Sequence, residues 1–112
     1  MDKITQYQKI ICQILEKYAS IKKVVTPDVK AQLIIDTNNL HYQLLSTGWH
    51  KNRYIYTVAF HFAIKNEKVW ILQNNTEAMI ADELYEQGIP KSDIILGFVP
   101  AKGRVYTGFG IE

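Results

Sequence analysis

Cysteine is almost absent from this chain. Its 112 residues include one cysteine, Cys12, so no disulfide can form within the chain. A chain without disulfides fits a reducing cytoplasm, which is the location we predict. A nucleophilic thiolate needs a neighbour that lowers its pKa, and no such residue is evident near Cys12. We therefore expect Cys12 to be a small packing residue.

Long apolar runs and a large net charge are also missing. No stretch approaches the roughly 20 apolar residues of a membrane-spanning helix, and the amino-terminal MDKITQYQK lacks the apolar segment of a signal peptide. The formal net charge of +2 is too small to indicate a nucleic-acid-binding protein by itself. With 47% hydrophobic and 21% charged residues, we expect residues 1–112 to form one domain with its own core.

The motifs of several enzyme classes are absent. No GxSxG or CxxC motif occurs, and GFG at 108–110 and AKGR at 101–104 do not match either glycine-rich phosphate-binding pattern. We therefore predict that the protein is not an enzyme and has no catalytic residue, no cofactor and no metal site.

The amino-terminal segment predicts an amphipathic helix over residues 3–20. Apolar residues recur there at spacings of three and four and form one stripe. Asp2 can cap this helix, because its carboxylate can accept hydrogen bonds from free amides of the first turn. A connector over 21–28, stopped by Pro27, is expected next. The stripe consists of Ile4, Tyr7, Ile11, Ile14, Leu15 and Tyr18.

Short β-branched and aromatic segments separated by turn residues predict a series of strands. Asn75 or Thr76 is expected to cap a second helix that ends near Gln87, before Gly88 and Pro90. The order predicts an α+β domain with an N-terminal helix, an antiparallel four-stranded meander, a second helix and one or two C-terminal strands. The predicted strands are 31–37, 40–46, 53–65 and 69–74, with a loop at 47–52, a tight turn at 66–67 and further extended segments at 94–98 and 105–111.

The predicted strand 53–65 has two different faces, because side chains alternate along a strand. The large apolar face is expected to be core, and the smaller mixed face suits half-exposure or a closely packed neighbour. The first face carries Tyr54, Tyr56, Val58, Phe60, Phe62 and Ile64, and the second carries Arg53, Ile55, Thr57, Ala59, His61, Ala63 and Lys65.

All three histidines lie between Leu40 and Phe62. In a meander His41 and His61 lie toward the same end and can approach each other, whereas His50 lies in a loop at the opposite end. Three converging metal ligands are therefore not expected. A weak metal site of His41, His61 and Asp36 would be the basis of an alternative, metal-dependent or hydrolytic function.

Direct nucleic-acid binding is a second alternative. Stacking surfaces need exposed aromatic residues beside basic ones, but the face of 53–65 that carries most aromatics is expected to be core. The second helix is acidic and would repel phosphate, with Glu77, Asp82, Glu83 and Glu86. The basic residues that remain as candidates are Lys51, Arg53, Lys102 and Arg104.

A protein–protein surface is the third kind of site. Trp and Arg are enriched at interface anchors, and Trp49, beside Gly48 in the predicted loop, is the best single anchor. The same side chain could instead cover one end of the core.

Several stretches form a joint pattern over nearly the whole chain: LHYQLLSTGW at 40–49, RYIY and HFAIK within 53–65, KVWILQNNTE at 68–77, IADELYEQGIPKSDIILGF at 80–98 and RVYTGFG at 104–110. In this order and spacing they resemble the XisI family, the fdxN element excision controlling factors of cyanobacteria. The most specific part is GIPKSDIILGF after KVWILQNNTE. Positions that match the family pattern are Gly48, Trp49, Arg53, His61, Lys68, Trp70, Glu77, Gly88, Pro90, Asp93, Gly97, Phe98, Arg104 and Thr107.

This resemblance implies an accessory role in the developmental excision of a DNA element. Family members act beside a XisH-like partner, while a separate recombinase cuts and joins the DNA. The resemblance implies no active site. Trp49, Arg53, His61 and Arg104 are the candidate partner contacts, and a homo-oligomer is a further option.

Overall fold

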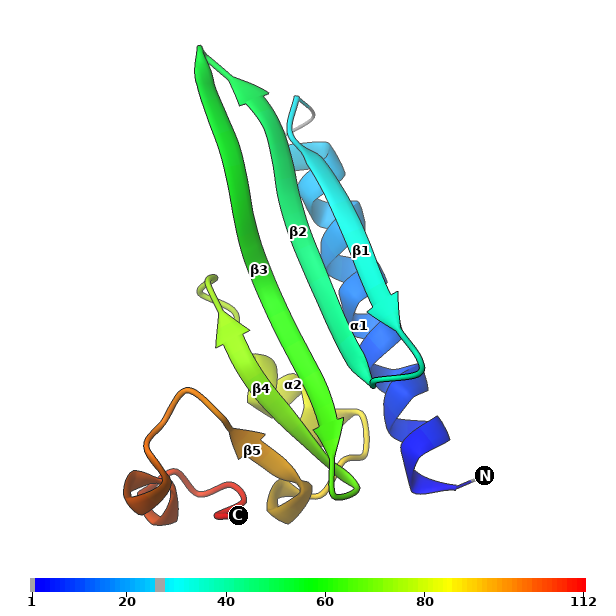
Figure 1. Cartoon of the computed structure of the whole chain (residues 1–112), viewed down its shortest axis with the longest axis vertical. Helices are drawn as coiled ribbons and strands as arrows, with labels where there is room; N and C mark the ends of the chain where they lie inside the picture. Colours follow the sequence, from blue (N-terminus) through cyan, green and yellow to red (C-terminus); the bar gives the residue numbers. More distant parts are fainter. Residues whose placement is uncertain (1, 26–27) are drawn as a thin grey trace.

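The computed structural model describes residues 2–25 and 28–112, and its elements form a five-stranded sheet with helices on one side (Figure 1). The sheet order is β1-β2-β3-β4-β5; neighbours from β1 to β4 are antiparallel and β5 runs parallel to β4. The predicted α+β class is confirmed. The elements are α1 (Lys3–Val25), β1 (Lys30–Asp36), β2 (His41–His50), β3 (Arg53–Lys65), β4 (Lys68–Asn74), α2 (Ile80–Glu86), the 3₁₀ helix η1 (Lys91–Asp93), β5 (Ile94–Leu96) and the 3₁₀ helix η2 (Ala101–Tyr106).

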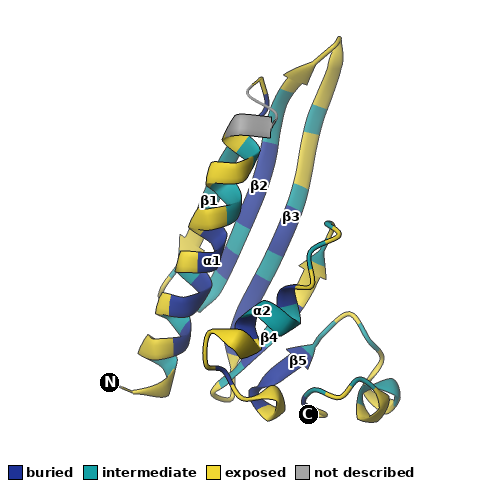
Figure 2. Ribbon diagram, turned by 180° about the vertical axis from the view of Figure 1, so that it is seen from behind, coloured by how far each residue is buried: buried dark blue, intermediate teal, exposed yellow. Residues whose placement is uncertain are grey.

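Both α-helices lie on the same side of the sheet, behind it in Figure 1 and in front of it in Figure 2. They are joined directly, because Lys17 Nζ of α1 lies 2.8 Å from Glu83 Oε1 of α2 and the Tyr18 hydroxyl donates to the same carboxylate. We call the covered side of the sheet the helix face and the other side the open face.

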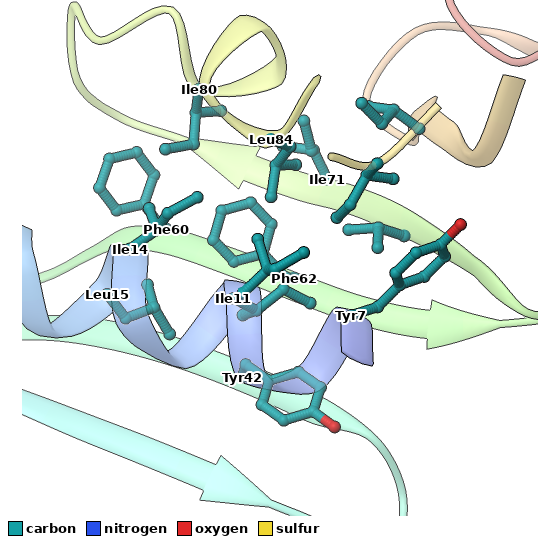
Figure 3. Packing of buried hydrophobic residues seen from close by; sticks show 14 of the residues in the cluster. Tyr7, Ile11, Ile14, Leu15, Tyr42, Phe60, Phe62, Ile71, Ile80 and Leu84 are labelled. Atoms are coloured by element: carbon teal, nitrogen blue, oxygen red, sulfur yellow. The ribbon is translucent and has the colours of Figure 1, made fainter. Parts of the chain in front are cut away.

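The core lies between the helices and the helix face (Figure 3). The predicted stripe of α1 supplies one wall, and the rings of Phe60 and Phe62 on β3 supply the centre of the other. The edge of the Tyr18 ring packs on Phe60 with 5.1 Å between ring centroids. Asp2 caps α1 as predicted, because its Oδ1 accepts from the Thr5 amide at 2.7 Å.

The buried carboxylate of Asp93 links the start of α1 to the carboxyl-terminal part of the chain. The Tyr7 hydroxyl donates to Asp93 Oδ2 at 2.5 Å, and Lys3 Nζ lies 3.1 Å from the same oxygen. Burial opposes ionisation of Asp93, but these two partners outweigh it and hold the pKa of its carboxyl below the usual value. Asp93 therefore stays charged inside the protein.

Two predicted boundaries in the first half of the chain were wrong. α1 continues through the expected connector to Val25, and Pro27 lies outside the described residues. β2 continues to His50, so the predicted loop at 47–52 shrinks to a two-residue turn. Lys51 and Asn52 have φ values of +49° and +66°, the backbone geometry of a tight hairpin turn whose twist matches the strands.

The second half of the chain is less regular than predicted. Helix α2 begins at Ile80 because Asn74 and Thr76 bond to the neighbouring backbone: Asn74 Oδ1 accepts from the Thr76 amide at 3.0 Å, and Thr76 Oγ1 accepts from the Ala78 amide at 3.0 Å. The predicted cap at Asn75 or Thr76 was therefore wrong. The segment 105–111 is not a strand, since η2 ends at Tyr106 and no helix or strand is assigned to residues 107–112.

The most consequential correction concerns the faces of β3. Leu44 of β2 lies opposite Phe60 while the next residue, Leu45, lies opposite Val58, so Ala59 has no partner on β2. This β-bulge reverses the alternation of side chains along the strand. Phe60, Phe62 and Ile64 face the core as predicted, but the side chains before the bulge exchange faces.

The exchange places Thr57 on the helix face and Tyr56 on the open face. Thr57 lies opposite Ser46, whose hydroxyl is 2.9 Å from Lys22 Nζ of α1. Tyr54 and Tyr56 are both exposed, so the prediction that they belong to the core was wrong.

We expect two aromatic residues of β3 to respond oppositely to truncation. Phe62→Ala should lower the free energy of unfolding by about 3–5 kcal/mol, because it leaves a cavity at a fully buried position. Tyr56→Ala should change it by only about 0.5 kcal/mol, because that ring is exposed. Urea denaturation of the two variants measures both values; equal losses would contradict the assigned faces.

Candidate functional site

Three exposed aromatic side chains lie together on the open face near the end of the β2–β3 hairpin. Trp49, Tyr54 and Tyr56 have 64%, 57% and 63% of their surface exposed. Trp49 and Tyr54 are directly opposite in the ladder, and their ring centroids are 5.3 Å apart. We call these three residues the aromatic strip.

The hairpin that carries the aromatic strip extends beyond the end of β1 (Figure 1). Trp49 points away from the helix face, since Ser46, three residues earlier, points toward α1. It therefore does not cover the core. Gly48 supports this arrangement: a Cβ at its position would lie 3.1 Å from the Asp28 carbonyl oxygen, so glycine lets the chain before β1 approach β2 closely.

His41 and His61 meet farther along the open face. His41 Nδ1 lies 3.0 Å from His61 Nε2, so the predicted approach across neighbouring strands is confirmed. A shallow hollow on the open face borders the pair and includes Ile34, Asp36 and Gln43. Burial, with a smaller contribution from His41, holds the pKa of His61 below its ordinary value. The neutral form of His61 is therefore favoured.

His50 lies at the far end of the sheet, as predicted, where its Nδ1 pairs with Asp28 Oδ2. In the described part of the chain, no group of three His, Cys, Asp or Glu side chains is arranged to hold a metal ion. Cys12 is partly buried, and burial raises the pKa of its thiol. These positions agree with the packing role predicted for Cys12 and with the separation predicted for His50.

The four basic candidates for nucleic-acid binding fall into two groups. Lys51 and Arg53 are at the hairpin tip, whereas Lys102 and Arg104 belong to η2 at the other end of the molecule (Figure 1). Arg104 already has internal partners: its guanidinium lies 5.1 Å from the centroid of the Trp70 ring, and its Nη1 donates to the Glu112 carbonyl oxygen at 2.7 Å. The structure therefore does not form one basic surface from these four.

The candidate partner contacts are also only partly brought together. Trp49 and His61 share the open face, but Arg53 lies opposite His50 and points to the side of the sheet that carries the helices. The sequence interpretation missed Tyr54 and Tyr56 as surface residues. Strict alternation hides them, because the bulge at Ala59 leaves no recognisable break in the sequence pattern.

The family model described as XisI protein matches residues 1–111. The chain belongs to the XisI family. A solved structure of a XisI-like protein from Anabaena variabilis ATCC 29413 is 39% identical, covers 97% of this chain and 99% of its own, and superposes with a TM-score of 0.89.

A second solved structure carries a functional name. The fdxN element excision controlling factor XisI from Anabaena variabilis ATCC 29413 is 35% identical, covers 99% of this chain and 100% of its own, and has a TM-score of 0.84. The XisI fold thus extends over essentially the whole of each chain. No curated protein matches the chain. Among the described residues, no helix is both long and apolar enough to cross a membrane.

We expect His61 to make the stability of the protein depend on pH above the range where carboxylates titrate. The pKa of His61 is lowered in the folded protein. As the pH falls below about 6.5, His61 is therefore protonated in the unfolded chain before it is protonated in the folded one, and this favours unfolding. The stabilisation is complete above the unfolded pKa and is lost as the pH falls through the folded one.

Chemical denaturation at pH 7.5 and pH 5.5 measures this effect. His61→Gln should lose less stability between the two pH values than the wild-type chain. Four carboxylates stay charged over this range because their pKa values are lowered, so they should not contribute to the change in stability. They are Asp28, Asp36, Glu83 and Asp93. An identical pH dependence in His61→Gln would contradict the prediction.

Proposed function

We propose that this XisI-family chain is a non-enzymatic controlling factor that binds a XisH-like protein and so regulates excision of a DNA element in the cyanobacterial cytoplasm. The observation that carries the proposal is the aromatic strip. Trp49, Tyr54 and Tyr56 are large, exposed and adjacent on the open face of the sheet, on the side opposite α1 and α2.

An antiparallel sheet can expose one face to water, but that face is then normally polar. Here the open face carries the aromatic strip and, farther along, the exposed side chain of Ile34. Aromatic residues are enriched in the buried centres of protein interfaces, where they often dominate the binding energy. A protein partner that covers this face would remove these rings from water.

The controlling role is supported by the relative named as an fdxN element excision controlling factor, which matches this chain over its full length. Regulation by protein contact suits the geometry around the strip, which offers rings on a rigid hairpin rather than a deep cleft. The pairing of β2 with β3 has no irregularity from Leu45 to His50, so the three rings are held on regular strands.

We expect single truncations in the aromatic strip to weaken partner binding. Trp49→Ala and Tyr56→Ala should each reduce the affinity for a XisH-like protein from the same genome by at least about tenfold, as expected for central interface aromatics. Titration calorimetry or a quantitative pull-down measures the loss. Tyr106→Ala is the matched control, because Tyr106 is an exposed tyrosine of η2.

The control should bind as the wild-type chain does, and all variants should remain folded by circular dichroism. No association of the wild-type chain at micromolar concentration would remove the partner proposal. Undiminished binding by both Trp49→Ala and Tyr56→Ala would place the partner elsewhere on the molecule.

Direct binding of single-stranded nucleic acid is the second candidate, and the exposure of Tyr54 and Tyr56 favours it. Exposed aromatic rings beside basic residues form stacking platforms for bases. Lys51 lies in the turn at the tip of the same hairpin, and Arg53 lies next to that turn on the other face of the sheet. Lys102 and Arg104 would take no part, because they lie at the other end of the molecule.

Fluorescence anisotropy with a labelled single-stranded oligonucleotide tests this candidate. Phosphate contacts predict a steep loss of affinity with salt, and Lys51→Glu with Arg53→Glu should flatten the slope. Lys102→Glu is the control and should leave the slope unchanged. Absence of binding at low salt would eliminate the nucleic-acid candidate.

A further inference from the structure

Strand β1 is a long, regular edge of the sheet. It contains seven residues, Lys30–Asp36, and pairs with β2 without a bulge. It lies at one side of the sheet (Figure 1). Within the described residues no strand pairs with its outer side. Such an edge presents a row of backbone donors and acceptors to any other strand that approaches it.

The opposite edge of the sheet is protected. β5 has only three residues, and the amide of Gly110 donates to the Ile94 carbonyl oxygen at 2.8 Å. The carboxyl-terminal segment therefore lies against this edge. β1 is less protected, because it contains no proline and no bulge, and its charged residues stand only at its two ends.

The centre of β1 is apolar. Ile34 and Ile35 are 45% and 40% exposed, on opposite faces of the sheet. Lys30 begins the strand and Asp36 ends it, on the open face, since they lie opposite Thr47 and His41 of β2. The strand therefore has opposite charges at its two ends and, apart from Gln32, apolar residues between them.

We propose that β1 pairs antiparallel with β1 of a second copy of this chain, about a twofold axis at Leu33. In this register Lys30 of each copy lies opposite Asp36 of the other. Gln32 then lies opposite Ile34, and Ala31 opposite Ile35. The two copies form one continuous sheet with the helices of both on the same side.

The side chains select this register. Residues directly opposite each other in an antiparallel pair point to the same face, and in the proposed pairing open-face residues meet open-face residues throughout. The register also pairs all seven residues of both strands. A shift of the register by two residues would keep each side chain on its own face of the sheet. It would, however, separate Lys30 and Asp36 of each copy from their partners in the other.

The helix face next to this edge can accept a side chain from the second copy. A groove runs between α1 and β1, lined by Ala19, Ser20, Lys23, Val29 and Ala31. Since Ala31 lies opposite Ile35 of the second copy in the proposed register, that exposed isoleucine is placed next to the groove. Closed twofold contacts of this kind are the commonest way in which proteins form homodimers.

Asp36 retains the capacity for the intermolecular ion pair. Its Oδ1 accepts from the amides of Asn38 and Asn39 at 3.0 Å each, and its Oδ2 accepts from Asn39 Nδ2 at 2.8 Å. These bonds hold the carboxylate at the end of the strand, and a carboxylate offers about four acceptor positions. The dimer would also place two aromatic strips on the same side of the joint sheet, although its formation does not depend on the proposed function.

Sedimentation velocity of the chain alone tests this pairing. Wild type should dimerise at a concentration of about 100 µM or below. Lys30→Glu should raise the dissociation constant at least about tenfold, because the introduced carboxylate would face Asp36 of the other copy. Ile34→Lys, which puts a charge in the middle of the edge, should do the same. Lys102→Glu, the same charge change in η2, should have no effect.

A charge exchange distinguishes this register from other dimers. Asp36→Lys should weaken self-association because the introduced ammonium group would face Lys30 of the other copy. An equimolar mixture of Asp36→Lys with Lys30→Glu should nevertheless dimerise, since one end of the mixed pair then joins two new opposite charges and the other end keeps the native Lys30–Asp36 pair. Circular dichroism checks that the turn after β1 survives Asp36→Lys; if it does not, Lys30→Glu and Ile34→Lys still decide the outcome.

The sedimentation results can overturn the proposal. Either of two of them is enough: a wild-type chain that stays monomeric at about 500 µM, or a dimer that Lys30→Glu and Ile34→Lys leave intact. Because no partner protein is present in these measurements, their failure is separate from a failure of the XisH-like partner proposal.

Discussion

The bulge at Ala59 is the constraint on which the arrangement of this protein depends. It lets one continuous strand, β3, put Phe60, Phe62 and Ile64 into the core and, on the other side of the bulge, put Tyr54 and Tyr56 on the open face. The bulge is held from outside the strand, because the Ala59 carbonyl oxygen accepts from the Asn75 amide at 2.8 Å. Without the bulge, the aromatic rings would all lie on one face.

The helix face and the open face of the sheet consequently have different roles. The helix face is covered by α1 and α2, and their junction through Glu83 with Lys17 and Tyr18 closes the core. The sequence analysis took the acidic residues of α2 as evidence against nucleic-acid binding. One of them, Glu83, instead pairs with residues of α1 within the protein. The open face keeps the aromatic strip and the His41–His61 pair, and so carries the features that support binding of a partner.

Sequence reasoning located the elements well where a periodic pattern was uninterrupted. The stripe of α1, the cap at Asp2, the bounds of β3 and the approach of His41 to His61 were all predicted and are observed. It was wrong where local hydrogen bonds compete with a regular pattern. Asn74 and Thr76 bond to the neighbouring backbone and delay α2, and the tight turn at Lys51 and Asn52 replaces the expected loop.

The sequence by itself determined the α+β class, the membership of the XisI family and the separation of His50 from the other two histidines. These three conclusions follow from periodicity, turn residues and the order of motifs, all of which can be read along the chain without knowing its contacts in space. Only the tertiary structure decided which aromatics are exposed, which sheet edge stays open and which charges are already paired. The physical reason is that a single extra residue in a ladder reverses every following side chain, and its position depends on contacts with β2 and Asn75 that no local pattern contains.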